Sequence, residues 1–199
     1  MEEKTIKIYT KKGDEGKTSL YDVGRISKSD LTFDLLGDLD ELSASIGLLV
    51  VSCSKITTGD DPKDPKNVVR ILRRIQHLLL DMGSNVATVS RRKKVIHTSE
   101  EEVKLLENCI DFYTESCPKL TDFILTGYTL ADSHAHLCRS IARRVERNLW
   151  KLNTQVNYLE KEVHLFQYIN RLSDFFFALA RYLCVVQGEK EVTRKEYSE

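Results

Sequence analysis

The sequence predicts an all-α protein, a five-helix bundle preceded by an extended N-terminal arm. Only three prolines and nine glycines occur in 199 residues, so long helices can run without interruption. Apolar residues recur at helical spacing in several separate segments, with no internal repeat and no low-complexity stretch. A chain of this length is expected to form a single domain, residues 1–199, around one core.

The first helix is expected over residues 39–53, with Asp38 as its N-cap and Glu41 three residues on, in the capping-box position. A second helix is expected over residues 68–86, where apolar residues follow the i, i+3, i+4, i+7 pattern. Turn-forming and charged residues fill the stretch between them, residues 54–67, which is typical of an exposed loop.

A third helix is expected to begin after Ser99, a good N-cap residue, and to stop before Pro118, which cannot continue a helix. Two further helices are expected over residues 130–152 and 161–187. A short polar turn around residues 153–157 is expected to separate them.

Composition excludes several classes of protein. The formal net charge of zero argues against a general nucleic-acid binder, which carries a basic excess. The most apolar stretch, residues 175–186, is short and contains Arg181, so no membrane span is expected. The five cysteines form no C-x-x-C pair and are expected to be reduced thiols. Residues 1–7 resemble no targeting signal, so a cytoplasmic protein is expected, or a mitochondrial one from which a transit segment has been removed.

Arginines recur in the fourth predicted helix. Arg139, Arg143 and Arg147 stand at steps of four, with Arg144 beside them. Residues four apart lie one turn above each other, so these guanidinium groups are expected along one edge of the helix. Such a row suits a polyanion such as a triphosphate, or carboxylates on another helix. A salt-bridged surface face is an equally good explanation of the spacing alone.

A glycine-containing polar segment lies in the N-terminal arm, at residues 10–19. Gly13 and Gly16 let a backbone wrap around phosphate oxygens, and Asp14 with nearby hydroxyls can hold Mg²⁺ or its waters. The segment is not a P-loop, because Lys11 stands where that motif needs a glycine. A plain surface turn explains the same residues equally well.

Other polar and aromatic residues carry weaker signals. Asp40, near the start of the first predicted helix, is a natural partner for one of the arginines, within one subunit or between two. Asn170 could anchor a base or a ribose by hydrogen bonds, although pairing with a neighbouring helix is the default. Phe123 would ordinarily pack a loop against a helix. His134 and His136 are two apart on divergent faces of a helix, so no residue is assigned as a direct metal ligand.

Three blocks, in this order and over most of the chain, resemble the PduO-type ATP:cob(I)alamin adenosyltransferases. They are residues 9–20 continuing to 25–28 and 37–42, residues 123–125 with 138–147, and residues 168–174. The resemblance implies a five-helix bundle that assembles as a homotrimer, with ATP and a corrinoid bound between neighbouring subunits. It makes the N-terminal arm a nucleotide-binding arm.

The resemblance also implies the reaction and the residues that carry it. The 5′-deoxyadenosyl group of ATP would pass to the cobalt of cob(I)alamin, giving adenosylcobalamin and triphosphate, with Mg²⁺ on the nucleotide. By similarity the catalytic residues are Arg139, Arg143, Asp40 and Phe123: Asp40 pairs with Arg139 across the subunit boundary, and Phe123 presses on the lower corrinoid face. The ATP-binding residues are Thr10, Gly13, Asp14, Gly16, Thr18, Ser19, Lys28, Arg139, Arg143, Arg144, Glu146 and Asn170.

The sequence departs from the family pattern beside the corrinoid-facing loop. Thr126 stands where the family usually has proline, and Tyr128 stands where it often has glycine. Residues 132–134 also stand where small apolar residues are usual. An alternative function is therefore a trimeric protein that binds ATP or adenosylcobalamin with weakened or lost corrinoid chemistry. A third alternative is a structural bundle whose arginines only pair subunits. A cobalamin reductase or an adenosylcobalamin-dependent enzyme is a candidate protein partner.

Overall fold

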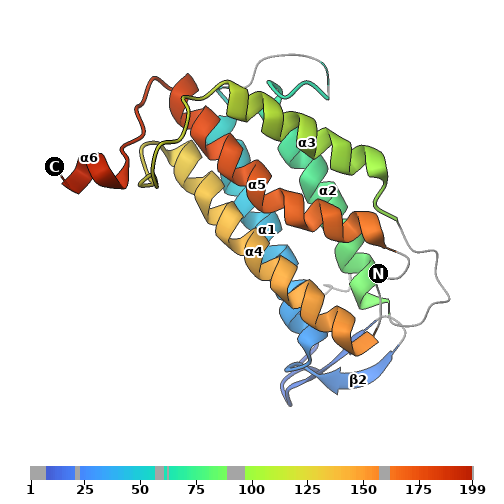
Figure 1. Ribbon diagram of the computed structural model, residues 1–199. Helices are drawn as coiled ribbons and strands as arrows, with labels where there is room; N and C mark the ends of the chain where they lie inside the picture. The colour runs from blue at the N-terminus through green and yellow to red at the C-terminus, as the bar shows by residue number, and fades with distance from the viewer. Residues whose placement is uncertain are drawn as a thin grey trace, which may run out of the picture.

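The computed structural model describes residues 8–20, 23–56, 61, 63–88, 97–156 and 162–198. Within them lie the helices α1 (Leu31–Cys53), α2 (Val68–Ala87), α3 (Glu100–Glu115), α4 (Leu130–Val156), α5 (Val163–Val186) and the short α6 (Arg194–Ser198). Strands β1 (Lys17–Leu20) and β2 (Val23–Ser27) form a small antiparallel sheet before α1 (Figure 1). The predicted all-α bundle of five long helices is confirmed. None of the helices in these ranges is long and apolar enough to cross a membrane.

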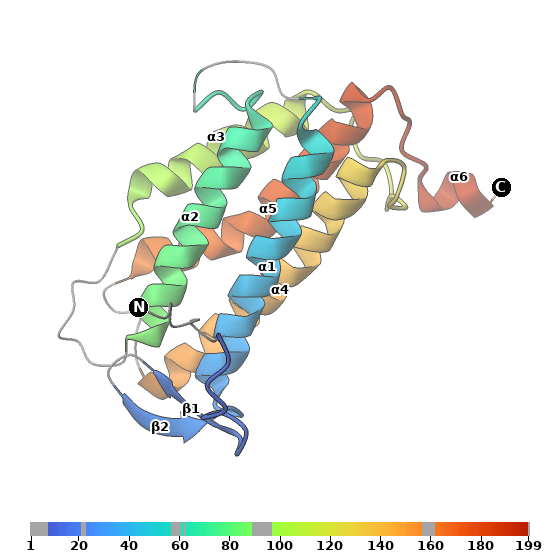
Figure 2. The same cartoon turned by 180° about the vertical axis from the view of Figure 1, so that it is seen from behind.

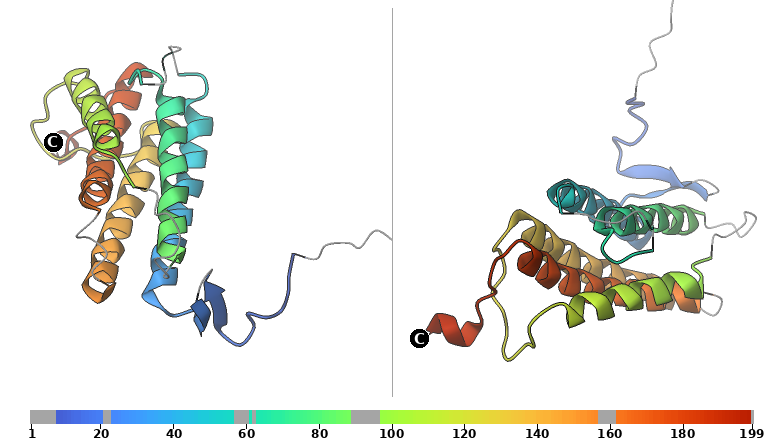
Figure 3. Two further views of the ribbon diagram at one scale, coloured as in Figure 1. Left: turned by 90° about the vertical axis from the view of Figure 1, so that its right-hand side faces the viewer. Right: turned by 90° about the horizontal axis from the view of Figure 1, so that it is seen from above.

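The bundle is built around α4, which packs against both α1 and α5. Helix α2 covers α1, and α3 covers α5 (Figure 2). Helices α1 and α4 run antiparallel, because Asp38 near the start of α1 contacts Asn148, whereas Ser52 near its end contacts His134 at the start of α4. The two strands and α6 therefore lie at opposite ends of the molecule (Figure 3).

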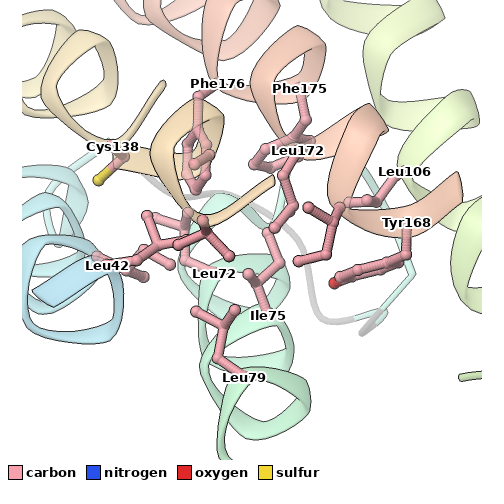
Figure 4. Close-up of a cluster of buried hydrophobic side chains, with 14 of the residues drawn as sticks. Leu42, Leu72, Ile75, Leu79, Leu106, Cys138, Tyr168, Leu172, Phe175 and Phe176 are labelled. Atoms are coloured by element: carbon pink, nitrogen blue, oxygen red, sulfur yellow. The ribbon is translucent and has the colours of Figure 1, made fainter. Parts of the chain in front are cut away.

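The five long helices each contribute apolar residues to one core (Figure 4). Burying a large apolar side chain stabilises the fold by about 1.5–3 kcal/mol, so the apolar side chains that the helices bury in this common core hold them together. The residues labelled in the figure are Leu42, Leu72, Ile75, Leu79, Leu106, Cys138, Tyr168, Leu172, Phe175 and Phe176.

The predicted start of the first helix is wrong. Helix α1 begins at Leu31, and its N-cap is Asp30, whose carboxylate accepts a hydrogen bond from the Thr32 N–H at 2.9 Å. Leu35 is buried and extends the apolar stripe back by a further turn, so helix formation continues through Gly37. Asp38 lies inside the helix instead of capping it.

The other predicted bounds hold more closely. Helices α2 and α3 end close to the predicted residues, and Ser99 is the N-cap of α3, although its side chain makes no capping hydrogen bond to the backbone. The turn predicted at residues 153–157 is wrong as far as residue 156, because α4 continues that far. Residues 157 and 161 lie outside the described residues. The two strands and α6 were not predicted.

Candidate active site

The N-terminal arm folds back on itself and brings three of the predicted ATP-binding residues together. The Gly16 N–H donates to the Gly13 carbonyl at 3.3 Å, and the Lys28 N–H donates to the Gly16 carbonyl at 2.9 Å. A Cβ at Gly13 would lie 3.1 Å from the Lys28 ammonium nitrogen, so the lysine side chain packs closely over this glycine. The arm is therefore a compact turn with a lysine laid across it.

The backbone of this turn adopts left-handed conformations at two points. Lys11 has φ of 60° and Gly16 has φ of 73°. Left-handed residues of this kind let a chain reverse its direction within a few positions. Strand pairing continues the arm, because Thr18 pairs with Ile26 and Ser19 with Arg25. The arm was predicted as a loop, since its polar residues show no alternating apolar pattern.

The arginines of α4 divide into two kinds. Arg144 is held within the chain: its Nε donates to Asp38 Oδ1 at 2.9 Å, and its Nη2 is bonded to Glu41. The hydrogen bond to Asp38 raises the pKa of the Arg144 guanidinium. Asn148 donates to the other oxygen of Asp38 at 2.7 Å, so this carboxylate is fully engaged. Arg144 therefore joins α4 to α1.

Arg139 and Arg143 are arranged differently. The Nε of Arg139 is buried and has no hydrogen-bond partner. Arg143 is exposed, and within the described residues its side chain forms no ion pair, while its carbonyl accepts a hydrogen bond from Arg147 at 3.1 Å. A buried donor without a partner is costly, which is why such groups commonly mark a binding site. These two guanidinium groups are available to an anion.

Glu146 and Asn170, two of the predicted ATP-binding residues, meet between α4 and α5. Asn170 Nδ2 donates to Glu146 Oε1 at 2.9 Å, and Arg171 Nη1 donates to Asn170 Oδ1 at 2.8 Å. Arg171 also donates to Glu107 of α3 at 3.0 Å. This chain of bonds fixes the Asn170 amide. Pairing with a neighbouring helix, the default expected for the polar residues at 170–174, is what Arg171 does.

Within one chain, Phe123 lies apart from the N-terminal arm. The arm adjoins the start of α1, whereas Phe123 lies near the other end of the bundle, on the loop between α3 and α4 (Figure 1). Its ring is 78% exposed. Asp40 is exposed, and in the described part of the chain it forms no ion pair with Arg139. A single copy thus presents the arm and the exposed Phe123 on two separate surfaces.

No group of three or more His, Cys, Asp or Glu residues that could hold a metal ion is present among the described residues. His134 Nδ1 instead lies 2.8 Å from the Ser52 hydroxyl, and His136 packs its ring against Phe177. Burial lowers the pKa of His136. Both histidines thus serve the contacts of α4 with its neighbouring helices.

The structure thus defines an antiparallel helical bundle preceded by a curled, glycine-bearing arm. The sequence identifies the family. Residues 8–183 match the cobalamin adenosyltransferases, and the chain belongs to that family.

Known relatives share this chain almost from end to end. The corrinoid adenosyltransferase of Bacillus subtilis is 39% identical over 194 residues, which cover 96% of this chain and 92% of the relative. The human corrinoid adenosyltransferase MMAB is 36% identical over 93% of this chain and 72% of its own length.

Solved structures give the same result. A variant of the PduO-type ATP:corrinoid adenosyltransferase from Lactobacillus reuteri, complexed with cobalamin and ATP, superposes with a TM-score of 0.78 at 32% identity, over 95% of this chain and 99% of that one. A second variant of that enzyme, complexed with ATP, gives a TM-score of 0.76 at 31% identity, over 94% of this chain and 99% of that one. The fold and the family therefore agree.

Proposed function

We propose that this protein transfers the 5′-deoxyadenosyl group of ATP to the cobalt of cob(I)alamin, giving adenosylcobalamin and triphosphate. Within the structure, the observation that carries the proposal is the pair of arginines on α4, Arg139 with a buried unpartnered Nε and Arg143 exposed. Membership of the cobalamin adenosyltransferase family supplies the chemistry for which such groups are suited. The whole chain would act as one domain.

The ATP site is built from two subunits of a homotrimer in this proposal. The arm of one subunit would supply the Gly13 N–H and the Lys28 ammonium group to the phosphates, and Gly16 would keep the arm curled. The partner subunit's Arg139 and Arg143 would approach the same phosphates from the other side, and Asp40 would pair with the partner's Arg139. Asp40 forms no ion pair with Arg139 among the described residues of one chain, which supports a pair made between two subunits.

The reaction asks for orientation and for charge stabilisation. The cobalt of cob(I)alamin is the nucleophile at C5′ of ATP, and triphosphate leaves with the electrons of the C5′–O bond. Holding C5′ in line with cobalt removes most of the entropic cost of the encounter. Arg143 and Lys28 would stabilise the charge that grows on the leaving triphosphate. Mg²⁺ would travel with ATP, its waters held by Asp14 and by the hydroxyls of Thr18 and Ser19.

Adenine and ribose would be bound by the polar pair between α4 and α5. Asn170 is already oriented by Glu146 and by Arg171, so its amide is fixed before ligand binds. A fixed polar group loses little entropy on binding, which favours affinity. Thr10 would complete the nucleotide site from the arm, and Arg144 would support it from its bonds to α1.

Phe123 would contact the lower face of the corrinoid. Its exposed ring would displace the axial base of the cobalamin and make the cobalt easier to reduce. A cobalamin reductase is then the natural protein partner, because the reaction needs cob(I)alamin. The binding-only alternative rests on Thr126 and Tyr128, and the structure gives it no specific support, since the Tyr128 hydroxyl is engaged by the backbone of Val192.

One anaerobic assay tests the proposal. Purified protein is mixed with ATP, Mg²⁺, cobalamin and a chemical reductant, and the loss of cob(I)alamin absorbance is followed together with the formation of a light-sensitive product. The proposal predicts ATP-dependent turnover and release of triphosphate. Binding of ATP without any adenosyl product would overturn it in favour of the binding-only alternative.

A further inference from the structure

Residues 189–198, here called the strap, fold back from the end of α5 onto the loop that carries Phe123. Two backbone hydrogen bonds join them: the Leu125 N–H donates to the Val192 carbonyl at 3.0 Å, and the Arg194 N–H donates to the Phe123 carbonyl at 2.7 Å. Ile124 and Thr193 pair between these two bonds as an antiparallel bridge. The strap is therefore hydrogen-bonded to the backbone of Phe123 itself.

Tyr128 fastens the same contact with its side chain. Its hydroxyl accepts a hydrogen bond from the Val192 N–H at 2.8 Å and lies 3.3 Å from the Val192 carbonyl, to which it donates. Tyr128 stands where the family resemblance leads one to expect glycine, and a glycine could make neither bond. Tyr128, whose departure from the family pattern suggested weakened corrinoid chemistry, thus connects the loop to the strap.

A buried ion pair anchors the strap to the bundle. Arg181 of α5 is only 5% exposed, and its guanidinium bonds the Glu191 carboxylate through Nε at 3.0 Å and through Nη2 at 2.9 Å. The same Nη2 donates to the Pro118 carbonyl at 2.8 Å, where the Phe123 loop begins. Separating a buried pair leaves a charge without its partner, so this anchor fixes where the strap can lie.

Asp132 holds the far end of the loop. It is 2% exposed, and its carboxylate accepts hydrogen bonds from the N–H groups of Gly127, at 3.1 Å, and Tyr128, at 3.2 Å, as well as from Thr129. The Thr129 hydroxyl in turn accepts from the Asp132 N–H at 3.0 Å and from the amide of Gln187 at 3.0 Å. The loop is fixed at its start, middle and end, while the Phe123 ring projects into solvent.

We propose that the strap and Tyr128 position Phe123 against the corrinoid, so that residues beyond the family match at 8–183 belong to the working corrinoid site. This inference rests on the proposed function. Tyr128 is a positioning residue: it acts on the corrinoid only through the backbone that carries Phe123. A fixed ring approaches the corrinoid without the entropic cost of ordering a loop, and a loosened one does not.

The test is Tyr128→Phe, which removes one hydroxyl and keeps the ring. Two hydrogen bonds are lost, so KM for the corrinoid is expected to rise about three- to tenfold while KM for ATP changes by less than about twofold. The absorption change of cob(II)alamin on binding, which reports loss of the axial base, is expected to shrink. Tyr197→Phe is the matched control, because Tyr197 is an exposed tyrosine of the strap whose hydroxyl has no contact in the described part of the chain, and it should behave as wild type.

A second variant, Arg181→Met with Glu191→Gln, removes both charges of the anchor together, so that neither is left buried alone. It is expected to raise KM for the corrinoid in the same selective way, with an unchanged ATP-dependent thermal shift. Wild-type corrinoid KM and absorption change in both variants would overturn the inference. So would equal losses for ATP and corrinoid, which would mean general destabilisation.

Failure of the proposed function would give a different result from failure of this inference. A wild-type protein that forms no adenosyl product contradicts the function and leaves the strap to be judged from cob(II)alamin binding. In that case weaker cobalamin binding by Tyr128→Phe supports the positioning role, and equal binding overturns it.

Discussion

Arg144 and Asp38, 106 residues apart, are joined by a 2.9 Å hydrogen bond that ties α4 to α1. One turn away on the same helix, the Nε of Arg139 is buried without a partner. The four arginines of α4 thus have different tasks. Arg144 faces two acidic side chains of α1 and holds α4 against that helix, and Arg147 donates to the Arg143 carbonyl. In the proposed function, Arg139 and Arg143 bind the ligand.

Removal of the exposed guanidinium should abolish most turnover. Arg143→Ala is expected to lower kcat by about a hundredfold or more, because a preorganised donor aimed at developing charge is lost. The assembly and the unfolding midpoint should not change, since Arg143 makes no ion pair in the described part of the chain. Arg73→Ala, which removes an exposed arginine of α2, is the control for a general effect of lost charge. Steady-state kinetics of both variants make the comparison, and equal losses of kcat would contradict the role given to Arg143.

Removal of Asp38 should act on stability instead. Asp38→Ala leaves Arg144 Nε and Asn148 without their acceptor, and because the arginine is partly exposed the expected loss is about 1–2 kcal/mol of unfolding free energy. Urea denaturation measures it. Asp111→Ala, at an exposed position of α3, should change the same quantity by less than about 0.5 kcal/mol. An Asp38 variant as stable as wild type would show that the connection is dispensable.

The ion pair between Arg181 of α5 and Glu191 of the strap predicts that losses of unfolding free energy at these two positions do not add. Glu191→Ala alone strands the Arg181 charge and should cost about 3 kcal/mol, the range for breaking a buried pair from one side. Adding Arg181→Met should restore part of that loss, because no buried charge then remains. Chemical denaturation of the two single variants and the double variant gives the coupling. Simple addition of the two losses would argue that the residues do not interact.

Acid should weaken the Phe123 loop through Asp132. Burial raises its pKa, but the hydrogen bonds from Thr129, Gly127 and Tyr128 outweigh burial, and the net pKa lies below the usual 3.8. A carboxyl with a depressed folded-state pKa contributes stability above its unfolded pKa and loses it as pH falls through the folded value. The stability difference between wild type and Asp132→Asn should therefore be full at pH 6 and shrink below pH 3.8. A difference that is constant across this range would contradict the bond pattern.

The long helices were predictable because each buries a stripe of the same period, and α2 follows the prediction almost residue for residue. The start of α1 was not, because Asp30 and Asp38 are both good N-cap residues. Two contacts of the fold separate them: Leu35 is buried in the core before Asp38 is reached, and Asp38 itself is bonded to Arg144, more than a hundred residues away. Local sequence carries no trace of such a partner.

Part of the candidate site was likewise predictable from local sequence, and part depends on contacts between distant residues. The row of arginines was visible from its spacing, and the arm from its glycines. Which arginines are free depends on the acidic residues of α1 that α4 meets in the fold. The contact between Tyr128 and Val192 joins positions 64 residues apart, so only the structure could reveal it.

The central claim is that one subunit's arm and another subunit's arginines act on the same ATP. Mixed oligomers of Lys28→Ala and Arg143→Ala test it most directly, since each variant alone should be almost inactive. In trimers that assemble at random from equal amounts, about a quarter of the sites combine an intact arm with an intact partner arginine. The mixture should then recover about a quarter of wild-type turnover. A mixture that exchanges subunits and shows no more activity than the two separate variants would contradict the claim.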